Sequence, residues 1–390
     1  MAQRYHIEPD LDFIKKIGTF GGEDLKKCYQ CATCSVVCEL APQQRPFPRK
    51  EMIWAQWGLK KKLFANPDVW LCNQCDDCST HCPRGARPGD VMAAIRRESV
   101  IHFAFPRLLG RWVSRPKYIP LLMSIPAVLL GLALLVKAPI ENAFGISKHF
   151  SENIVFSTTR MFPHWLLNSF FSFFTVLAFI ATIVGVMRFW RAMKTAGAQD
   201  GITTPARGLV QSILSVLKSI ITHNNLTMCT TESSRFLYHL FAFHGFMALF
   251  VVTLWVITAA YNPLIPNGFI YPFNFWNPWK MLANLGGIAL ISGCVLMIRD
   301  RLRKREQGGS STFFDWAFIW TLLAVAITGL ITELLHYARL EPHRYIAYFI
   351  HLAFVFALLM YLPYSKFAHL AYRTIAMVYA EYYDRTGEAS

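Results

Sequence analysis

Six long apolar segments dominate the hydrophobic pattern of the chain after its first hundred residues. They cover residues 119–137, 164–190, 236–260, 280–298, 313–335 and 345–365. Each is close to the ~20 residues that a helix needs to cross ~30 Å of hydrocarbon, although the first is short and contains two prolines. The pattern therefore predicts a bundle of six transmembrane helices over residues 119–370.

Residues 1–105 alternate polar and apolar positions irregularly and are interrupted by prolines. This pattern predicts a compact, mostly helical soluble domain. A basic linker, residues 106–118, joins it to the bundle, and residues 371–390 are expected to form a tail. The predicted fold class is therefore mostly α, with a soluble domain followed by a six-span helical bundle.

Residues 208–222 predict a shorter, amphipathic helix between the second and third spans. Leu209, Ile213, Leu217 and Ile220 fall on one side of it, and polar residues on the other. Such a helix lies on a membrane surface or packs against the soluble domain, and the sequence leaves both possibilities open.

Composition agrees with a membrane protein. The chain is 54% hydrophobic and 16% charged, with a mean hydropathy of +0.31 and a formal net charge of +15. The basic residues gather at the ends of the apolar segments instead of forming one stripe, which argues against nucleic-acid binding. They fit anionic lipid or an acidic partner.

The distribution of basic residues predicts the orientation in the membrane. The stretches 188–235 and 299–305 are rich in lysine and arginine, whereas the alternate connections contain few. Because basic connections stay in the cytoplasm, we expect a multi-pass inner-membrane protein whose soluble domain and both termini are cytoplasmic.

Eight of the ten cysteines form two short runs with the same C-x2-C-x2-C-x3-C spacing. The first run is Cys28, Cys31, Cys34 and Cys38, and the second is Cys72, Cys75, Cys78 and Cys82. Bacterial two-cluster ferredoxins have this spacing, and there the fourth cysteine of each run binds the other cluster.

That rule assigns two crossed ligand sets for two [4Fe–4S] clusters. Cys28, Cys31, Cys34 and Cys82 hold cluster 1, and Cys72, Cys75, Cys78 and Cys38 hold cluster 2. Structural zinc sites are the alternative, but they typically use two separated pairs of ligands and not two runs of four.

Histidines in or beside the spans are candidates for axial ligands of b-type haem. His351 and His369 are 18 residues apart, which is five turns of one helix, so both are expected on one face and ~27 Å apart. His239 or His244, in the third span, is expected to pair with His369 at an inner haem. A lone histidine can instead make a hydrogen bond between helices. The sequence predicts one or two haems.

The partner of His351 at an outer haem stays open, with His244, His336 and His164 as the alternatives. Four further histidines lie outside the spans and are interpreted as ordinary: His102, His149, His223 and His343.

The end of the fifth span predicts a quinone site. Glu333 and His336 lie there with Tyr337 and Arg339, and such groups can take up the protons of a quinol. Aromatic and charged residues also gather at membrane boundaries without binding anything. A similar group at the inner side is the alternative site: Arg235, Tyr238 and His239.

Two parts of the chain resemble known families. The first hundred residues resemble the small iron–sulfur subunit of heterodisulfide reductases. The segment from His351 to His369 is similar to the last span of respiratory nitrate reductase gamma subunits, where two histidines bind two b haems, and the segment around His244 is similar to their partner helix.

The fusion of these parts resembles the membrane-embedded iron–sulfur subunit of quinone-interacting membrane-bound oxidoreductases of sulfate reducers. The resemblance implies menaquinone as substrate, soluble flavin and iron–sulfur subunits as partners, and adenylylsulfate reductase downstream. The chain has no glycine-rich nucleotide motif of its own, so a flavin is expected on another subunit.

The favoured hypothesis is an electron-transfer subunit that links menaquinol, haem and two clusters to cytoplasmic partners in dissimilatory sulfate reduction. A membrane subunit of a heterodisulfide reductase-like complex is one rival. A transporter or sensor with an iron–sulfur regulatory domain is another, although no convincing internal repeat is present.

Overall fold

The computed structural model describes residues 8–143, 161–223, 234–261, 273–306 and 311–385. Within these ranges the regular structure is helical and contains no strand. The predicted fold class, a mostly α chain with a soluble domain and a six-span bundle, is confirmed.

The N-terminal domain is built from short helices around one central helix. They are α1 (Leu11–Ile17), η1 (Gly18–Gly22), η2 (Glu23–Lys27), α2 (Thr33–Val36), α3 (Arg49–Gln56), α4 (Lys60–Phe64), α5 (Asp68–Leu71), α6 (Asp77–Thr80) and α7 (Pro88–Phe103). The first begins where Asp10 accepts a hydrogen bond from the Phe13 N–H at 2.8 Å. The longest, α7, begins with proline and is buried along most of its length.

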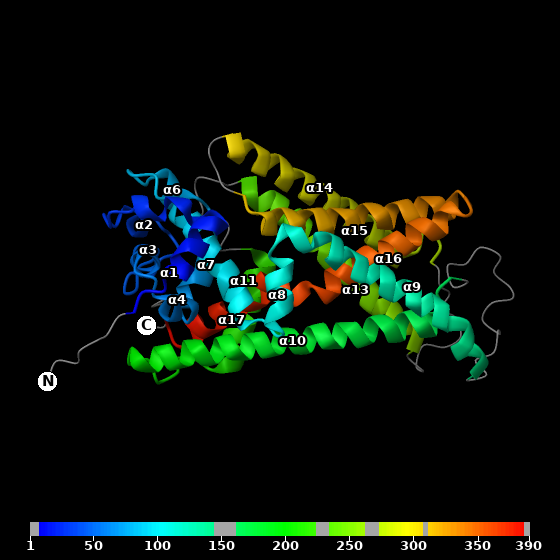
Figure 1. Ribbon diagram of the computed structural model, residues 1–390, viewed down its shortest axis with the longest axis horizontal. Helices are drawn as coiled ribbons and strands as arrows, with labels where there is room; N and C mark the ends of the chain where they lie inside the picture. Colours follow the sequence, from blue (N-terminus) through cyan, green and yellow to red (C-terminus); the bar gives the residue numbers. More distant parts are fainter. Residues whose placement is uncertain (1–7, 144–160, 224–233, 262–272, 307–310, 386–390) are drawn as a thin grey trace.

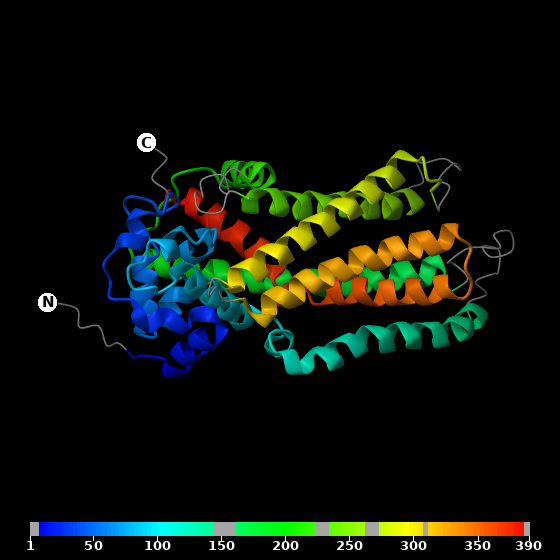
Figure 2. The ribbon, with the colours of Figure 1, turned by 90° about the horizontal axis from the view of Figure 1, so that it is seen from above.

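The predicted linker is helical as well, and six long apolar helices follow it. The elements are α8 (Arg107–Val113), η3 (Pro116–Tyr118), α9 (Ile119–Ala143), α10 (His164–Gln199), α13 (Ser234–Tyr261), α14 (Pro278–Glu306), α15 (Phe313–Tyr337) and α16 (His343–Met360). All six spans, α9, α10 and α13 to α16, are long and apolar enough to cross a membrane, counted over the described ranges. They run side by side with the N-terminal domain at one end (Figures 1 and 2).

The amphipathic stretch forms α11 (Leu209–Thr222), which packs against α17 (Ala368–Tyr382). Val216 of α11 is buried in a cluster with Met377 and Val378 of α17. Several apolar side chains on the other faces of α11 are exposed, including Val210 and Leu214. The helix therefore packs on one side against the protein and offers an apolar surface on the other.

The predicted continuous helix through His351 and His369 is wrong. The last span, α16, ends at Met360, a short η6 (Leu362–Tyr364) follows, and His369 belongs to α17. Proline at position 363 cannot donate the backbone hydrogen bond that a continuing helix needs. The two histidines therefore lie on separate helices, and the five-turn argument does not apply to them.

One hydrophobic core joins the N-terminal domain to the bundle. Trp70 of α5 stacks on Tyr372 of α17 with ring centroids 5.3 Å apart, and Phe189 of α10 lies 5.5 Å from the same tyrosine. All three side chains are buried, in a cluster that also contains residues of α1 and α7. Residues 371–382, expected only as part of a tail, are thus a packed helix that joins the two parts.

Two glycines let α13 and α14 approach each other closely. A Cβ atom on Gly293 would lie 2.6 Å from the Ala242 amide nitrogen and 2.9 Å from the Tyr238 carbonyl oxygen. A Cβ on Gly245 would lie 2.6 Å from the Leu290 amide nitrogen. Small residues at such contacts are a common basis of helix association in membranes.

Gly293→Ala is expected to destabilise the bundle, because the added methyl group must separate two backbones. Overpacking of this kind costs about 1–3 kcal/mol of unfolding free energy. Gly131→Ala is the matched control, since its Cβ would meet nothing within 4 Å. Thermal unfolding in detergent should show a lower midpoint for Gly293→Ala alone. Equal midpoints for both variants would contradict the close contact.

Candidate functional site

Both cysteine runs adopt the same unusual backbone conformation. Gln30 and Ala32 in the first run have φ angles of 69° and 71°, and Gln74 and Asp76 at the equivalent positions of the second have 56° and 64°. Residues with side chains rarely adopt this left-handed conformation outside constrained sites. In each run a one-turn helix follows, α2 or α6. The chain therefore turns around the cysteine side chains in the same way twice.

The first three cysteines of the first run meet the last cysteine of the second. A small pocket is lined by Cys28, Cys31, Cys34 and Cys82. Burial raises the pKa of the Cys34 thiol to about 11, and the neighbouring sulfurs of the other three contribute to that rise. Four sulfurs around one pocket are the donor set that a cubane cluster requires.

A second group forms around Cys78. Burial raises the pKa of this thiol well above its usual range, and the next causes are its neighbours Cys72 and Cys38. Cys75 lies half-buried in the same run. The fourth cysteine of the first run, Cys38, thus stands beside Cys78 of the second run.

Among the described residues, no three histidine, cysteine, aspartate or glutamate side chains are close enough to hold one metal ion. Tetrahedral zinc would need four donors at about 2.0–2.3 Å. The two repeated runs of four cysteines are the observation that favours clusters over zinc.

Hydrogen bonds to sulfur occur in both groups. The backbone N–H of Gln74 donates to the Cys72 sulfur, and the backbone N–H of Ala86 donates to the Cys82 sulfur, both at 3.3 Å. Hydrogen bonds to cluster sulfurs are one of the ways in which proteins adjust reduction potentials.

The two groups differ in position. Cys31 is exposed at the surface next to Tyr29, whose side chain is 58% exposed. The second group faces the bundle, because the Cys72 carbonyl accepts hydrogen bonds from Arg96 at 2.9 Å and from Arg373 of α17 at 3.3 Å.

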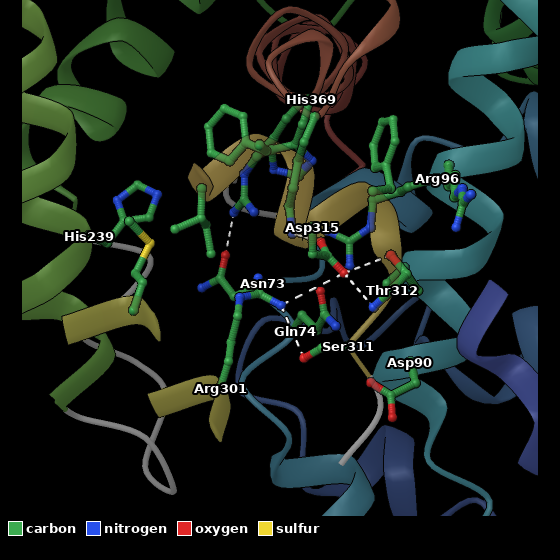
Figure 3. A pocket seen from close by; sticks show the side chains of 18 of the residues that line it. Asn73, Gln74, Asp90, Arg96, His239, Arg301, Ser311, Thr312, Asp315 and His369 are labelled. Carbon is green, nitrogen blue, oxygen red and sulfur yellow. Dashed lines mark hydrogen bonds and ion pairs between the residues drawn. The ribbon is translucent and has the colours of Figure 1, made fainter. Parts of the chain in front are cut away.

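A cavity of about 850 Å³ lies between the second cysteine run and the ends of the long helices that face the N-terminal domain (Figure 3). Its wall includes Asn73, Gln74 and Asp76, which lie within the run itself. Apolar residues from the bundle line it as well: Phe243, Phe246, Met247, Met297, Phe318, Ile319, Leu322 and Phe367. The cavity therefore combines apolar walls with polar groups next to the cysteines.

His369 of α17 and His239 of α13 both line this cavity, on different helices (Figure 3). Removal from water lowers the pKa of His369 well below its usual range, and the cations of Arg96 and Arg373 lower it further. Its imidazole is therefore neutral at pH 7, the form that binds a metal. Its ring centroid is 5.7 Å from that of Trp70.

His223, interpreted from the sequence as ordinary, also lines the cavity. Its Nε2 atom lies 3.1 Å from Nδ1 of His239. No short motif connects two histidines 16 residues apart across a connection, so sequence patterns gave no signal for this contact. His244 is exposed, and its Nδ1 bonds the Leu240 carbonyl at 3.1 Å.

His351 lies away from this cavity, against α15. Its Nδ1 is 3.1 Å from the Thr328 hydroxyl, and a Cβ on Gly329 would lie 3.1 Å from its Cε1. The ring thus packs directly on the backbone of α15. The side chain of its candidate partner His164 lies outside the described part of the chain.

The residues predicted to bind quinone lie at the far end of α15. Glu333 pairs with Lys280 at 2.8 Å and accepts a hydrogen bond from Asn284 at 3.1 Å, both on α14. His336 is half-buried one turn further along, beside Tyr337. Arg339, the fourth member of the predicted group, is exposed at the helix end.

Two residues of the alternative group predicted from the sequence, Tyr238 and His239, line the same cavity as His369. Tyr238 donates to Asp300 of α14 at 2.9 Å. The side chain of Arg235 is outside the described part of the chain.

Fold and site together define a multi-pass membrane protein with an iron–sulfur dicluster domain. Residues 24–86 match the 4Fe-4S dicluster domain family. Residues 118–390 match the family of Citrate utilization protein B. Because the second match covers more than half of the chain, the protein belongs to the Citrate utilization protein B family.

Individual relatives reflect the same two parts. Citrate utilization protein B of Escherichia coli is 26% identical over 389 residues, which cover 91% of this chain and 89% of that protein. The C-type subunit of the H(2):CoB-CoM heterodisulfide,ferredoxin reductase of Methanothermobacter marburgensis is 34% identical over 91 residues, 23% of this chain and 49% of that subunit. A protein of Archaeoglobus profundus, named for its likeness to the C-type subunit of heterodisulfide reductase, is 33% identical over 109 residues, 28% of this chain and 58% of its own length. No solved structure is similar enough to the chain to give a match.

Cys38→Ala is expected to disturb the cluster of the second run, because Cys38 stands beside Cys72 and Cys78. About eight cluster iron atoms per chain are expected before mutation. Electron paramagnetic resonance of the reduced variant should show one altered cluster signal.

Cys82→Ala is the matched partner variant, since it removes the fourth sulfur from the pocket of the first run. The two variants should alter different cluster signals. If Cys38→Ala and Cys34→Ala alter the same signal, the crossed arrangement is wrong.

Proposed function

We propose that this protein is a membrane electron-transfer subunit that exchanges electrons between menaquinol and cytoplasmic oxidoreductase subunits. Two [4Fe–4S] clusters and b-type haem are its proposed cofactors. The observation that carries the proposal is the position of the cavity: His239 of α13 and His369 of α17 both line it, and the second cysteine run forms part of its wall.

The cavity fits a haem in size, donors and charge. Its volume of about 850 Å³ is within the usual range of cofactor sites. His239 and His369 would supply the axial nitrogen ligands, and the surrounding phenylalanines and methionines would contact the apolar ring. Cations suited to the two propionates also line it: Arg96, Arg301, Lys366 and Arg373.

The cysteines fit two cubane clusters. Cys28, Cys31, Cys34 and Cys82 would bind cluster 1, and Cys72, Cys75, Cys78 and Cys38 would bind cluster 2. Bound clusters and haem supply one-electron transfer, which side chains alone do not provide.

The proposed sites follow one another in an order that suits electron transfer. The haem cavity adjoins the second cysteine run, and Arg373, one turn after His369, bonds the Cys72 carbonyl. The first group lies further out, with Cys31 exposed. This order suits a route from the bundle to cluster 2, then to cluster 1, and out to a partner docked at the surface beside Tyr29.

His351 is proposed to ligate a second, outer haem. Thr328 gives its hydroxyl proton to the Ala324 carbonyl at 2.6 Å, so its oxygen can accept the His351 Nδ1–H at 3.1 Å. That arrangement leaves Nε2 unprotonated, as metal binding requires. His336 and His164 remain its candidate partners.

Glu333 and His336 are proposed to form the quinone site at the outer end of α15. Oxidation of a quinol releases two protons together with two electrons, so nearby bases are needed. Lys280 and Asn284 hold the Glu333 carboxylate in place, and the imidazole of His336 offers a second base one turn away. The group around Tyr238 in the inner cavity is the alternative site.

The proposed setting is the inner membrane, with the N-terminal domain and both termini in the cytoplasm. The basic ends of α10 and α14 lie on the side of the N-terminal domain, in agreement with the positive-inside rule (Figure 1). Soluble flavin and iron–sulfur subunits are the proposed partners, because the N-terminal relatives are named as subunits of reductases.

The identity of those partners has three candidates. The resemblance to quinone-interacting oxidoreductases suggests adenylylsulfate reductase, in dissimilatory sulfate reduction. A disulfide-reducing subunit follows from the N-terminal relatives, and an enzyme of citrate utilization follows from the name of the full-length relative. Purification of the native complex, with identification of the bound subunits, distinguishes them.

His369→Ala and His239→Ala are each expected to lose the inner haem, because each removes one axial ligand. The haem content, measured as pyridine haemochrome, should fall by one haem per chain in either variant, and His351→Ala should remove the outer haem independently.

His343→Ala is the control, since this histidine is exposed at the start of α16. His239 and His244 are both candidate ligands of the inner haem on α13. His244→Ala tests which of them binds it, and this variant should retain haem. Full haem content in both His239→Ala and His369→Ala would refute the inner site.

Glu333→Gln is expected to slow haem reduction by a quinol about 100-fold, the usual size of a lost acid–base contribution. His336→Ala should have a similar effect, with haem content unchanged in both. Stopped-flow absorbance at the haem band measures the rate, and Glu141→Gln at the end of α9 is the control. Wild-type rates in both variants would reject the outer site and favour the inner group.

A further inference from the structure

His223 connects the surface helix α11 to the candidate haem ligand His239. It follows α11 directly and adopts a left-handed backbone conformation, with φ of 56°. The ring is buried, in edge contact with Phe243 at 5.0 Å and with His239 at 5.1 Å between centroids. The packing of Val216 against α17 fixes the helix that carries it.

If the His223 ring is neutral, its two hydrogen bonds can be assigned donors and acceptors in only one way. Its Nδ1 lies 3.1 Å from the Ile221 carbonyl oxygen, and a carbonyl can only accept, so Nδ1 carries the proton. The Nε2 of the same ring is then an acceptor. It lies 3.1 Å from Nδ1 of His239, which must therefore be the donor.

This hydrogen bond determines which nitrogen of His239 can bind a metal. A neutral His239 with its proton on Nδ1 has an unprotonated Nε2, and His239 lines the haem-sized cavity. Haem and other metal sites commonly use such a partner, which fixes the tautomer and orientation of the ligating histidine and raises its basicity.

We propose that His223 is a positioning residue for His239: it accepts the Nδ1 proton of His239 in a hydrogen bond and thereby holds Nε2 in place as an axial ligand. This inference rests on the proposed haem site. It assigns a role to α11, which presents an exposed apolar face and packs on its other side against α17.

The test uses the full-length protein in detergent. His223→Ala removes the acceptor, so the ligand becomes a weaker donor to ferric haem and its orientation is less defined. The expected results are a higher midpoint potential of one haem and a shifted low-spin electron paramagnetic resonance signal. His223→Gln should restore both toward wild type, because its side-chain oxygen can accept the same hydrogen bond while an amide does not replace a histidine as haem ligand.

Thr222→Ala is the matched control, since this exposed neighbour bonds backbone carbonyls within α11. Unchanged potential and signal in His223→Ala would overturn the proposal. Loss of haem in both His223→Ala and His223→Gln would also overturn it, because His223 would then act as a ligand itself. Loss in the alanine variant with recovery in the glutamine variant supports it.

The His239→Ala variant separates this inference from the proposed function. If it keeps all haem, the haem site itself is wrong. If it loses haem while His223→Ala matches wild type in potential and signal, only the positioning role fails.

Discussion

The contact between Trp70 and Tyr372 is the interaction on which the rest of this structure depends. It lies in a buried core shared by the N-terminal domain, α10 and α17, and not at a boundary between two separate units. Electron transfer requires redox groups at fixed, short separations, and a flexible linker would not maintain them. The shared core holds the second cysteine run against the cavity that His369 lines.

The break after α16 makes that contact possible. A continuous helix would have carried residues 361–382 straight out of the bundle. Instead, the chain turns at η6, where the Tyr361 hydroxyl donates to the Leu122 carbonyl at 2.8 Å and the Tyr364 hydroxyl donates to the Phe105 carbonyl at 2.6 Å. These bonds tie the turn to the first span and to the segment that leads into it. The redirected α17 then packs against the iron–sulfur domain (Figure 2).

The family relationships agree with this integrated architecture. Similarity to the heterodisulfide reductase subunits covers about a quarter of the chain, whereas similarity to Citrate utilization protein B of Escherichia coli covers 91% of it. The dicluster region is thus shared with proteins that do not match the rest of this chain, whereas the Escherichia coli relative matches both parts. Residues at the junction, including Arg96 and Arg373 around the Cys72 carbonyl, connect the two parts chemically.

The sequence by itself determined the features that depend on local spacing. Hydropathy sets the six membrane helices because each must bury about 20 residues in lipid, and the repeated cysteine spacing predicts the crossed grouping because a cubane needs four thiolates. It did not determine which histidines lie close together. The packing of α11 brings His223 next to His239, and the break after α16 places His369 on a different helix from His351. Separation along the sequence gives no information about such contacts. Only the tertiary structure decided that the cavity lies between the bundle and the second cysteine run.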